Sequence, residues 1–95
     1  MSKFNPGRIV GTPGAIAALE ESGQTPDFFL DQHIAGNWGL VDKEDWNTND
    51  VAAKGGGRIM SEYVTLKGKK IWIITEAEGD DGKREATTLL LPSEY

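Results

Sequence analysis

The chain has no cysteine and a single histidine among its 95 residues. Without cysteine it can form neither a disulfide bond nor a thiolate metal site, which fits a reducing compartment. One histidine, with no His-x-x-x-His pair and no Asp-x-Asp-x-Asn-Gly loop, does not make a metal site either. We therefore expect no bound metal ion and no other cofactor.

Long hydrophobic runs are also missing. No apolar stretch of this chain approaches the ~18 residues of a membrane-spanning helix. The first segment, Met1–Pro6, lacks the apolar core of a secretory signal peptide. We therefore expect a cytoplasmic protein that makes no contact with a membrane.

The usual signatures of catalysis are absent as well. The sequence contains no Gly-x-Ser-x-Gly nucleophile elbow and no carboxylate pair of defined geometry. The triplet Gly55-Gly56-Gly57 is not a phosphate-binding loop, because no Lys-Ser or Lys-Thr pair follows it and no helical pattern begins there. We interpret it as a flexible joint, and we expect binding rather than catalysis.

What the sequence does contain is enough apolar material for one core. Hydrophobic residues make up 38% of the chain, which is too many for a wholly disordered segment. A chain of this length is typical of one domain. We therefore expect residues 1–95 to fold as a single domain without a partner.

Charge is unevenly distributed. The formal net charge is -5, yet residues 54–70 hold five cations and one carboxylate. An acidic total argues against strong non-specific nucleic-acid binding, which depends on neutralising phosphates. The basic segment is either a solvated hairpin with lysines that protect a sheet edge or a local nucleic-acid contact. The residues of that alternative contact are Arg58, Lys67, Lys69, Lys70 and Arg84.

Local signals predict three helices after a short strand at Arg8–Val10. Thr12-Pro13 and Thr25-Pro26 are typical helix starts, with a hydroxyl cap before a proline at the first helical position. Gly23 and Gly36 end these two helices. A third, weaker helix begins at Asp42, which with Asp45 makes a variant capping box.

The last third of the chain predicts β-structure. Residues 59–66, 70–76 and 86–91 are rich in β-branched and apolar residues, with a two-residue turn at Lys67-Gly68 and a polar loop at 78–85. We expect an α+β fold: a short N-terminal strand, two or three helices, then a three-stranded antiparallel β-meander with the helices packed on one face. The predicted core is Phe28, Phe29, Leu30, Ile34, Ile71, Ile73, Leu89 and Leu91.

The segment from His33 to Gly39 is the first candidate for a site. His33 is the natural acid–base group, because its unperturbed pKa lies near neutrality; the alternative is a histidine packed at the edge of the core. Asn37-Trp38 follows the helix, and Trp38 is either a recognition platform or a plug over the helix end. The acidic run that comes next either mimics phosphates toward a basic partner or is a solvated helix face. The candidate binding residues are His33, Asn37, Trp38, Asp42, Glu44 and Asp45.

A catalytic alternative combines His33 with Tyr63, Glu76 or Arg84. Such a set suits acid–base cleavage of a phosphodiester. It requires these side chains to converge in one cleft, which no sequence spacing demands.

Four segments carry a resemblance to a known family: Ile9–Ala15, His33–Gly39, Ile71–Ala77 and Thr87–Tyr95. Together they resemble a family of small bacterial proteins described as plasmid-related or phage-related proteins of unknown function. The most specific pieces are His-x-x-Gly-x-Trp-Gly at 33–39 and Leu-Leu-Pro-x-Glu-Tyr at 90–95. The family usually has Asp where this chain has Asn37, and it has a shorter connection than 78–85, so no acidic role carries over to position 37.

The resemblance implies a setting on a mobile genetic element and little chemistry. We expect a small accessory protein of a plasmid or phage that acts as a non-enzymatic protein-interaction module, for instance as an inhibitor of a host defence system. The partner would be a protein. The order of elements is also similar to that of RelE-type ribonuclease toxins, which are strongly basic whereas this chain is acidic. The alternative is therefore a small RelE-like ribonuclease or nucleic-acid-binding protein.

Overall fold

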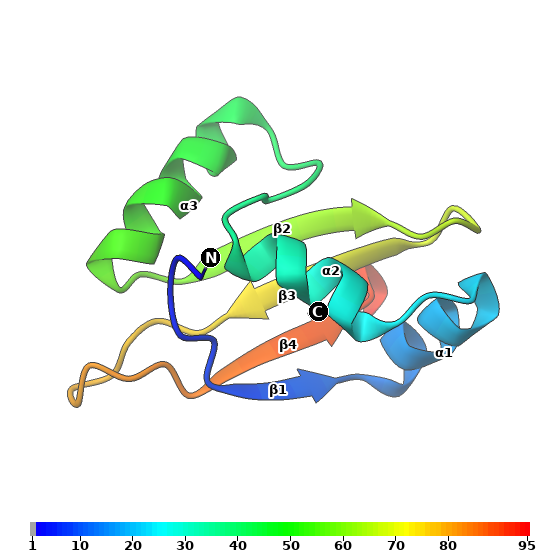
Figure 1. Ribbon diagram of the computed structural model, residues 1–95, viewed down its shortest axis with the longest axis horizontal. Coiled ribbons are helices and arrows are strands. Elements are labelled where there is room, and N and C mark those ends of the chain that lie inside the picture. The colour runs from blue at the N-terminus through cyan, green and yellow to red at the C-terminus, as the bar shows by residue number, and fades with distance from the viewer. Residues whose placement is uncertain (1) are drawn as a thin grey trace.

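The protein is an α+β structure built on one four-stranded sheet (Figure 1). The computed structural model describes residues 2–95. The strands are β1 (Arg8–Gly11), β2 (Ile59–Val64), β3 (Lys70–Thr75) and β4 (Ala86–Leu90). The helices are α1 (Pro13–Ser22), α2 (Pro26–Ile34) and α3 (Lys43–Gly55), with a final 3-10 turn, η1 (Pro92–Glu94).

The helix boundaries follow the predicted local signals. Thr12 caps α1 by accepting a hydrogen bond from the amide of Ala15, and Gly23 ends that helix in the left-handed conformation. Asp42 caps α3 by accepting from the amide of Asp45, so the weaker third helix is confirmed. Thr25 makes no side-chain cap bond, and α2 starts on the preset backbone angle of its first proline.

The sheet is mixed, which corrects the expected strict antiparallel meander. Strands β2, β3 and β4 form the predicted meander, but β1 pairs in parallel with β4, giving the order β1-β4-β3-β2. In this register Ile9 lies opposite Thr87. The sequence pattern of β1 predicts a strand but not its partner. That partner, β4, lies some 80 positions farther along the chain, and the pairing depends on how the intervening helices pack on the sheet.

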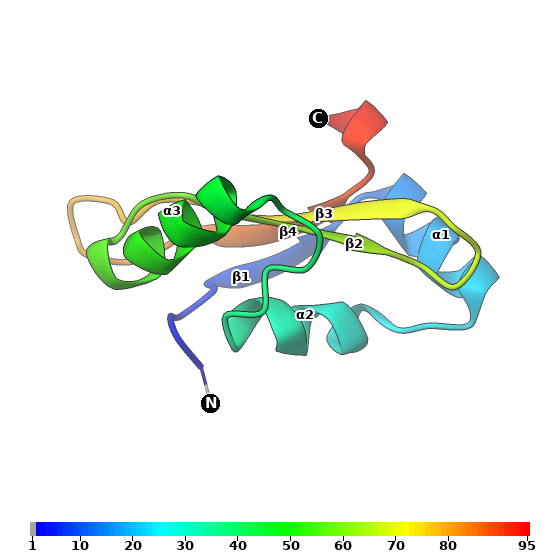
Figure 2. The same ribbon diagram turned by 90° about the horizontal axis from the view of Figure 1, so that it is seen from above.

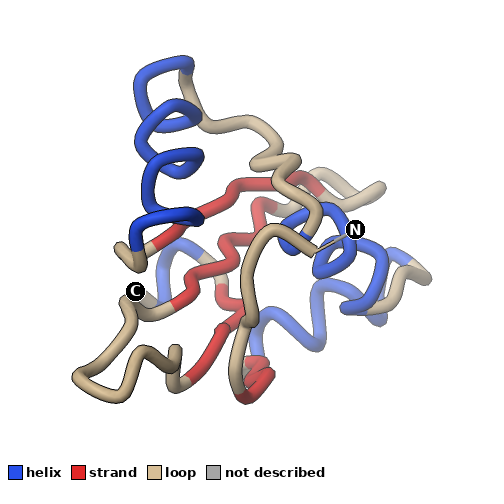
Figure 3. Tube along the Cα trace, turned by 60° about the vertical axis from the view of Figure 1, so that its left-hand side comes forward, coloured by secondary structure: helices blue, strands red, loops and turns tan. Residues whose placement is uncertain are grey.

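Two helices cover one face of the sheet, and the third lies elsewhere. The main core joins α1 and α2 to the sheet through Leu19, Phe29, Leu30, Ile71 and Ile73, among others. Figure 2 shows α2 on this side of the sheet and η1 on the opposite side. Helix α3 instead lies along the β2 edge, apart from the other two helices (Figure 3). The expectation that all the helices pack on one face is therefore wrong for α3.

The β2 edge is covered by side chain and loop, so it is not free for pairing. The amide of Asn49 in α3 donates to the Met60 carbonyl (2.7 Å) and accepts from the Met60 amide (3.2 Å). Farther along the strand, Glu62 exchanges backbone bonds with Trp38 and Leu40. These contacts fix α3 and the loop before it against the sheet.

The β2–β3 turn differs from the sequence prediction. The β2–β3 hairpin has a three-residue loop, 66–68, closed by the bond from the Thr65 amide to the Lys69 carbonyl, rather than a two-residue turn. Gly68 takes the left-handed position (φ 85°) that such loops require at their third residue.

The glycine triplet, Gly55–Gly57, forms the hydrogen-bonded end of α3 and not the flexible joint that we expected. Helix α3 continues through Gly55, and Gly56 ends it in the left-handed conformation (φ 88°). The guanidinium of Arg84 then binds the carbonyls of Ala52 and Gly57. The glycines end the helix, and a distant arginine fixes that end.

Most of the predicted core is buried. Phe29, Leu30, Ile71, Ile73 and Leu89 are buried, whereas Ile34 and Leu91 are half-buried. Phe28 is 56% exposed, so that prediction is wrong. Adjacent helical residues point about 100° apart, and Phe29 takes the inward position while Phe28 contacts its ring from outside. Over residues 2–95, no helix has the length and apolarity that a membrane crossing requires.

Candidate functional site

His33 lies at the centre of a buried hydrogen-bond network. Its side chain has no exposed surface. On one side of the ring, Nδ1 lies 2.5 Å from the Ser61 hydroxyl of β2, and on the other Nε2 lies 2.8 Å from the Thr75 hydroxyl of β3. The last turn of α2 is thereby tied to two neighbouring strands.

The donor and the acceptor of each hydrogen bond in this network can be assigned by starting from the last group of the chain, the Pro6 carbonyl. The Pro6 carbonyl can only accept, so the Thr87 hydroxyl donates its one proton there (2.7 Å). Thr87 therefore accepts from Thr75 (2.7 Å), and Thr75 in turn accepts from Nε2 of His33. Burial lowers the pKa of His33 and keeps the ring neutral, so the remaining nitrogen, Nδ1, accepts from the Ser61 hydroxyl. His33 is thus a neutral imidazole with its proton on Nε2.

This arrangement does not suit acid–base catalysis. Burial, followed by the nearby positive charge of Arg84, lowers the pKa of His33 from 6.5 to about 3. Both ring nitrogens already have partners inside the fold. The imidazole therefore stays neutral at ordinary pH and has no free nitrogen for a substrate.

Two other members of the catalytic alternative, Tyr63 and Arg84, are also engaged in structure, whereas the Glu76 side chain is exposed. The Tyr63 hydroxyl donates to the Asn37 carbonyl (2.6 Å), and burial raises the pKa of Tyr63 to about 12. Arg84 is buried and donates to three carbonyls, those of Ala52, Gly57 and Glu76. The set has no free acid–base pair.

Trp38 closes a second, smaller core. It is fully buried against Ala52 and Ile59, with Phe4 packed on the same cluster. Its indole N–H donates to Asp50 (2.9 Å). The burial of Trp38 therefore favours a plug over the helix end rather than a recognition platform.

The backbone of β2 comes very close to the turn that follows α2, at Gly39. A Cβ on Gly39 would lie 2.0 Å from the Glu62 carbonyl oxygen, and its φ of 75° favours glycine independently. Asn37 is exposed, and its side chain accepts from the Gly39 amide (3.2 Å). The segment 33–39 thus packs α2 against the sheet through His33 and Trp38, and the residues that it exposes are Ala35 and Asn37.

The acidic run divides by role. Asp42 caps α3, and Asp50 receives the Trp38 indole. Glu44 and Asp45 are exposed on the first turn of α3. Within residues 2–95, the side chains of these two residues make no hydrogen bond to the rest of the fold.

The residues of the nucleic-acid alternative do not form one patch. Arg84 is buried, and Lys67, Lys69 and Lys70 are exposed around the β2–β3 turn. Arg58 precedes the other end of β2. Strand β2, which separates Arg58 from the three lysines, is about 20 Å long at ~3.3 Å per residue.

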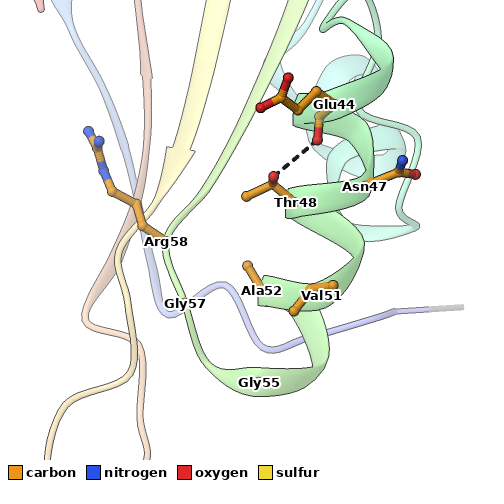
Figure 4. A pocket seen from close by; sticks show the side chains of 8 residues that line it. All are labelled: Glu44, Asn47, Thr48, Val51, Ala52, Gly55, Gly57 and Arg58. Carbon is orange, nitrogen blue, oxygen red and sulfur yellow. Dashed lines mark hydrogen bonds between the residues drawn. The ribbon is translucent and has the colours of Figure 1, made fainter.

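A groove that no sequence motif marks runs along α3. It has a volume of about 690 Å³ and is lined by Glu44, Asn47, Thr48, Val51, Ala52, Gly55, Gly57 and Arg58 (Figure 4). We call it the α3 groove. Its helical members recur every three or four residues, so they form one side of α3. The available signal in the sequence was that spacing, with the exposed Val51 following Glu44, Asn47 and Thr48 on the same side of the helix.

An aromatic and cationic cluster adjoins the α3 groove. Arg58, which lines the groove, donates to the Tyr95 hydroxyl (2.9 Å). The Tyr95 ring meets the Trp72 ring edge-on, with centroids 5.6 Å apart, and Trp72 donates to the Glu62 carboxylate (2.9 Å). Tyr95 is 69% exposed. We call the α3 groove together with Arg58, Tyr95 and Trp72 the docking surface.

Comparison with known proteins identifies no relative. A scan against protein-family models, a search of curated proteins and a search of solved structures each returned no match. The family resemblance seen in the sequence therefore stays a prediction. In the part of the chain that the structure describes, no group of three or more His, Cys, Asp or Glu side chains could hold a metal ion.

Proposed function

We propose that this chain is a non-enzymatic protein-interaction module that binds its partner through the docking surface. The observation that carries the proposal is the exposure of Val51, at 72%, in a groove whose Arg58 binds the Tyr95 hydroxyl, with the Tyr95 ring against Trp72. Tryptophan, tyrosine and arginine supply most hot spots of protein interfaces. An apolar side chain on the wall of a groove is the kind of feature that a partner covers.

The other candidate surfaces support this choice by elimination. His33 and Trp38 have no exposed surface through which to recognise a partner. A ribonuclease built on His33 lacks its general base, because both ring nitrogens are hydrogen-bonded inside the fold. In the setting that the family resemblance implies, the proposed module is an accessory protein of a plasmid or phage, and inhibition of a host system is one action open to it.

The test is affinity capture from a bacterial lysate with three forms of the chain. Wild-type protein and Leu66→Asp should retain the same stoichiometric partner, and Val51→Asp should lose it. Leu66 is the matched control, since it is also apolar and exposed (80%) but lies at the far β2–β3 turn. Equal capture by Val51→Asp, or no stoichiometric partner for the wild type, would overturn the proposal.

A further inference from the structure

We propose that two copies of this chain pair through β1 in antiparallel orientation, so that their sheets join into one. Strand β1 is the outermost strand at one edge of the sheet, the lower edge in Figure 1. Strand β2 and helix α3 lie at the opposite edge, so the α3 groove stays open in such a pair. The proposal therefore stands or falls independently of the proposed function.

The two edges of the sheet differ in how they are covered. At the β2 edge, the side chain of Asn49 and the backbone of Trp38 and Leu40 bind the outward groups of the strand. At the β1 edge, all four residues of the strand are exposed, and Arg8 is the one charged residue among them. An uncovered edge strand is a template for pairing with another chain.

The hydrogen bonds of β1 show which of its backbone groups face outward. The amides of Arg8 and Thr12 donate to carbonyls on the β4 side, over 3.1 and 3.0 Å. Successive residues of a strand point their N–H and C=O groups alternately to one side and to the other. Ile9 and Gly11 therefore point both groups away from β4, where a further strand could bind them.

One antiparallel register pairs all of these outward groups. When Ile9 of one copy lies opposite Gly11 of the other, and Gly11 opposite Ile9, every outward amide of both strands meets an outward carbonyl. The arrangement has a two-fold axis, as most homodimers do. The axis passes through the pair of Val10 residues, each 37% exposed in the single chain. The second copy thus covers an apolar side chain with its own equivalent.

The same register brings opposite charges together. Arg8 and Thr12 are four residues apart along the strand and so point to the same face of the sheet. Across the axis, Arg8 of one copy lies opposite Thr12 of the other. The Thr12 hydroxyl donates to the Glu94 carboxylate (2.5 Å), which is exposed and otherwise accepts from the uncharged amides of Gly14 and Leu91. Arg8 of each copy is therefore placed to pair with Glu94 of the other.

This charge match selects a second copy over an unrelated strand. Within one copy, Arg8 and Thr12 are ~13 Å apart along β1, at ~3.3 Å per residue, so the ion pair forms between copies. The two-fold axis makes that pair twice, once on each side of Val10. An unrelated strand could bind the backbone of Ile9 and Gly11, but it has no built-in partner for Arg8 and Glu94.

The first experiment is sedimentation equilibrium of the full chain from about 10 μM to about 1 mM, the range in which a small interface associates. We expect the average mass to rise from that of one chain toward that of two. Arg8→Glu should raise the dimer Kd about a hundredfold, since it reverses two symmetric charge contacts worth about tenfold each. The matched control is Lys67→Glu, the same change of charge at the exposed β2–β3 turn, which should leave the Kd unchanged.

Amide hydrogen exchange of the ¹⁵N-labelled chain then tests which surface associates. Exchange at the outward amides of Ile9 and Gly11 should slow as the protein concentration rises. A mass of one chain at every concentration would overturn the inference and leave this edge to an unrelated strand. Equal weakening by Arg8→Glu and Lys67→Glu would overturn it as well, and so would a dimer in which exchange at Ile9 and Gly11 does not depend on concentration.

Discussion

The His33–Gly39 turn and the α3 groove are close in sequence and opposite in character. The turn holds the lone histidine and a tryptophan, both fully buried with their polar atoms paired. The groove is lined by polar, small and aliphatic residues of α3 together with Gly57 and Arg58, and it is open to solvent. The histidine and tryptophan that stood out in the sequence therefore stabilise the fold, while a stretch without a recognisable motif forms the open surface.

A buried polar network explains why the turn uses such residues. Throughout residues 2–95, no buried side-chain nitrogen or oxygen lacks a hydrogen-bond partner. A satisfied network specifies one packing arrangement, because any shift of α2 would leave several groups unpaired at once. The same role accounts for Arg84, which ties the end of α3 to the loop after β3.

Acidification should destabilise the buried network around His33 by more than the loss of the Arg84 side chain or of a helix cap. The folded-state pKa of His33 is about 3, against 6.5 when unperturbed, so between these values the unfolded chain binds a proton that the folded chain does not. The free energy of unfolding should therefore fall as pH drops from 6.5 to 3, by roughly 4–5 kcal/mol in total. Urea denaturation across this range measures the loss.

His33→Gln separates this effect from that of the carboxylates. The amide supplies one acceptor and one donor to the network but does not titrate. Its free energy of unfolding should vary less with pH than that of the wild type. Equal pH slopes for the two proteins would show that His33 is not the group responsible.

Removal of the Arg84 side chain should have the next largest effect. Arg84→Met leaves three carbonyls without their charged donor, which we expect to lower the free energy of unfolding by about 3 kcal/mol. Lys83→Met is the control, because Lys83 is exposed and adjacent in sequence. The two urea midpoints compare a buried cation with a solvated one, and similar midpoints would contradict the assigned role of Arg84.

The two Thr-Pro helix starts give a smaller and sharper contrast. Thr12 caps α1 through its side chain and also donates to Glu94, whereas Thr25 makes no cap bond. Thr12→Ala should therefore lower the free energy of unfolding by about 1 kcal/mol. Thr25→Ala should change it little. Chemical denaturation of both variants checks the difference, and equal losses would mean that the observed cap bond adds nothing.

Features that depend on neighbouring residues could be predicted from the sequence. The starts of α1 and α3 follow from Thr12 and Asp42, and the end of α1 follows from Gly23. The apolar run of β3 likewise identifies a buried strand. Each of these signals acts within a few residues of itself.

Features that join distant parts of the chain could not be predicted. Nothing local to β1 states that its partner is β4, and nothing in the polar loop states that Arg84 returns to the carbonyls of Ala52 and Gly57. The α3 groove has the same origin, since its two walls come from a helix and from the segment that enters β2. For His33 and Trp38, the sequence allowed both a buried and an exposed role, and only the packing decides between them.

The smallest effect on stability should come from the α3 groove itself. Val51→Asp replaces an exposed side chain, so the free energy of unfolding should change by no more than about 0.5 kcal/mol. The same change at Ile59, which is fully buried beside Trp38, should abolish the cooperative unfolding transition. Thermal denaturation followed by near-ultraviolet circular dichroism measures both. If Val51→Asp lowered the free energy of unfolding by more than ~2 kcal/mol, Val51 would contribute to the core. The groove would then matter for stability rather than for binding.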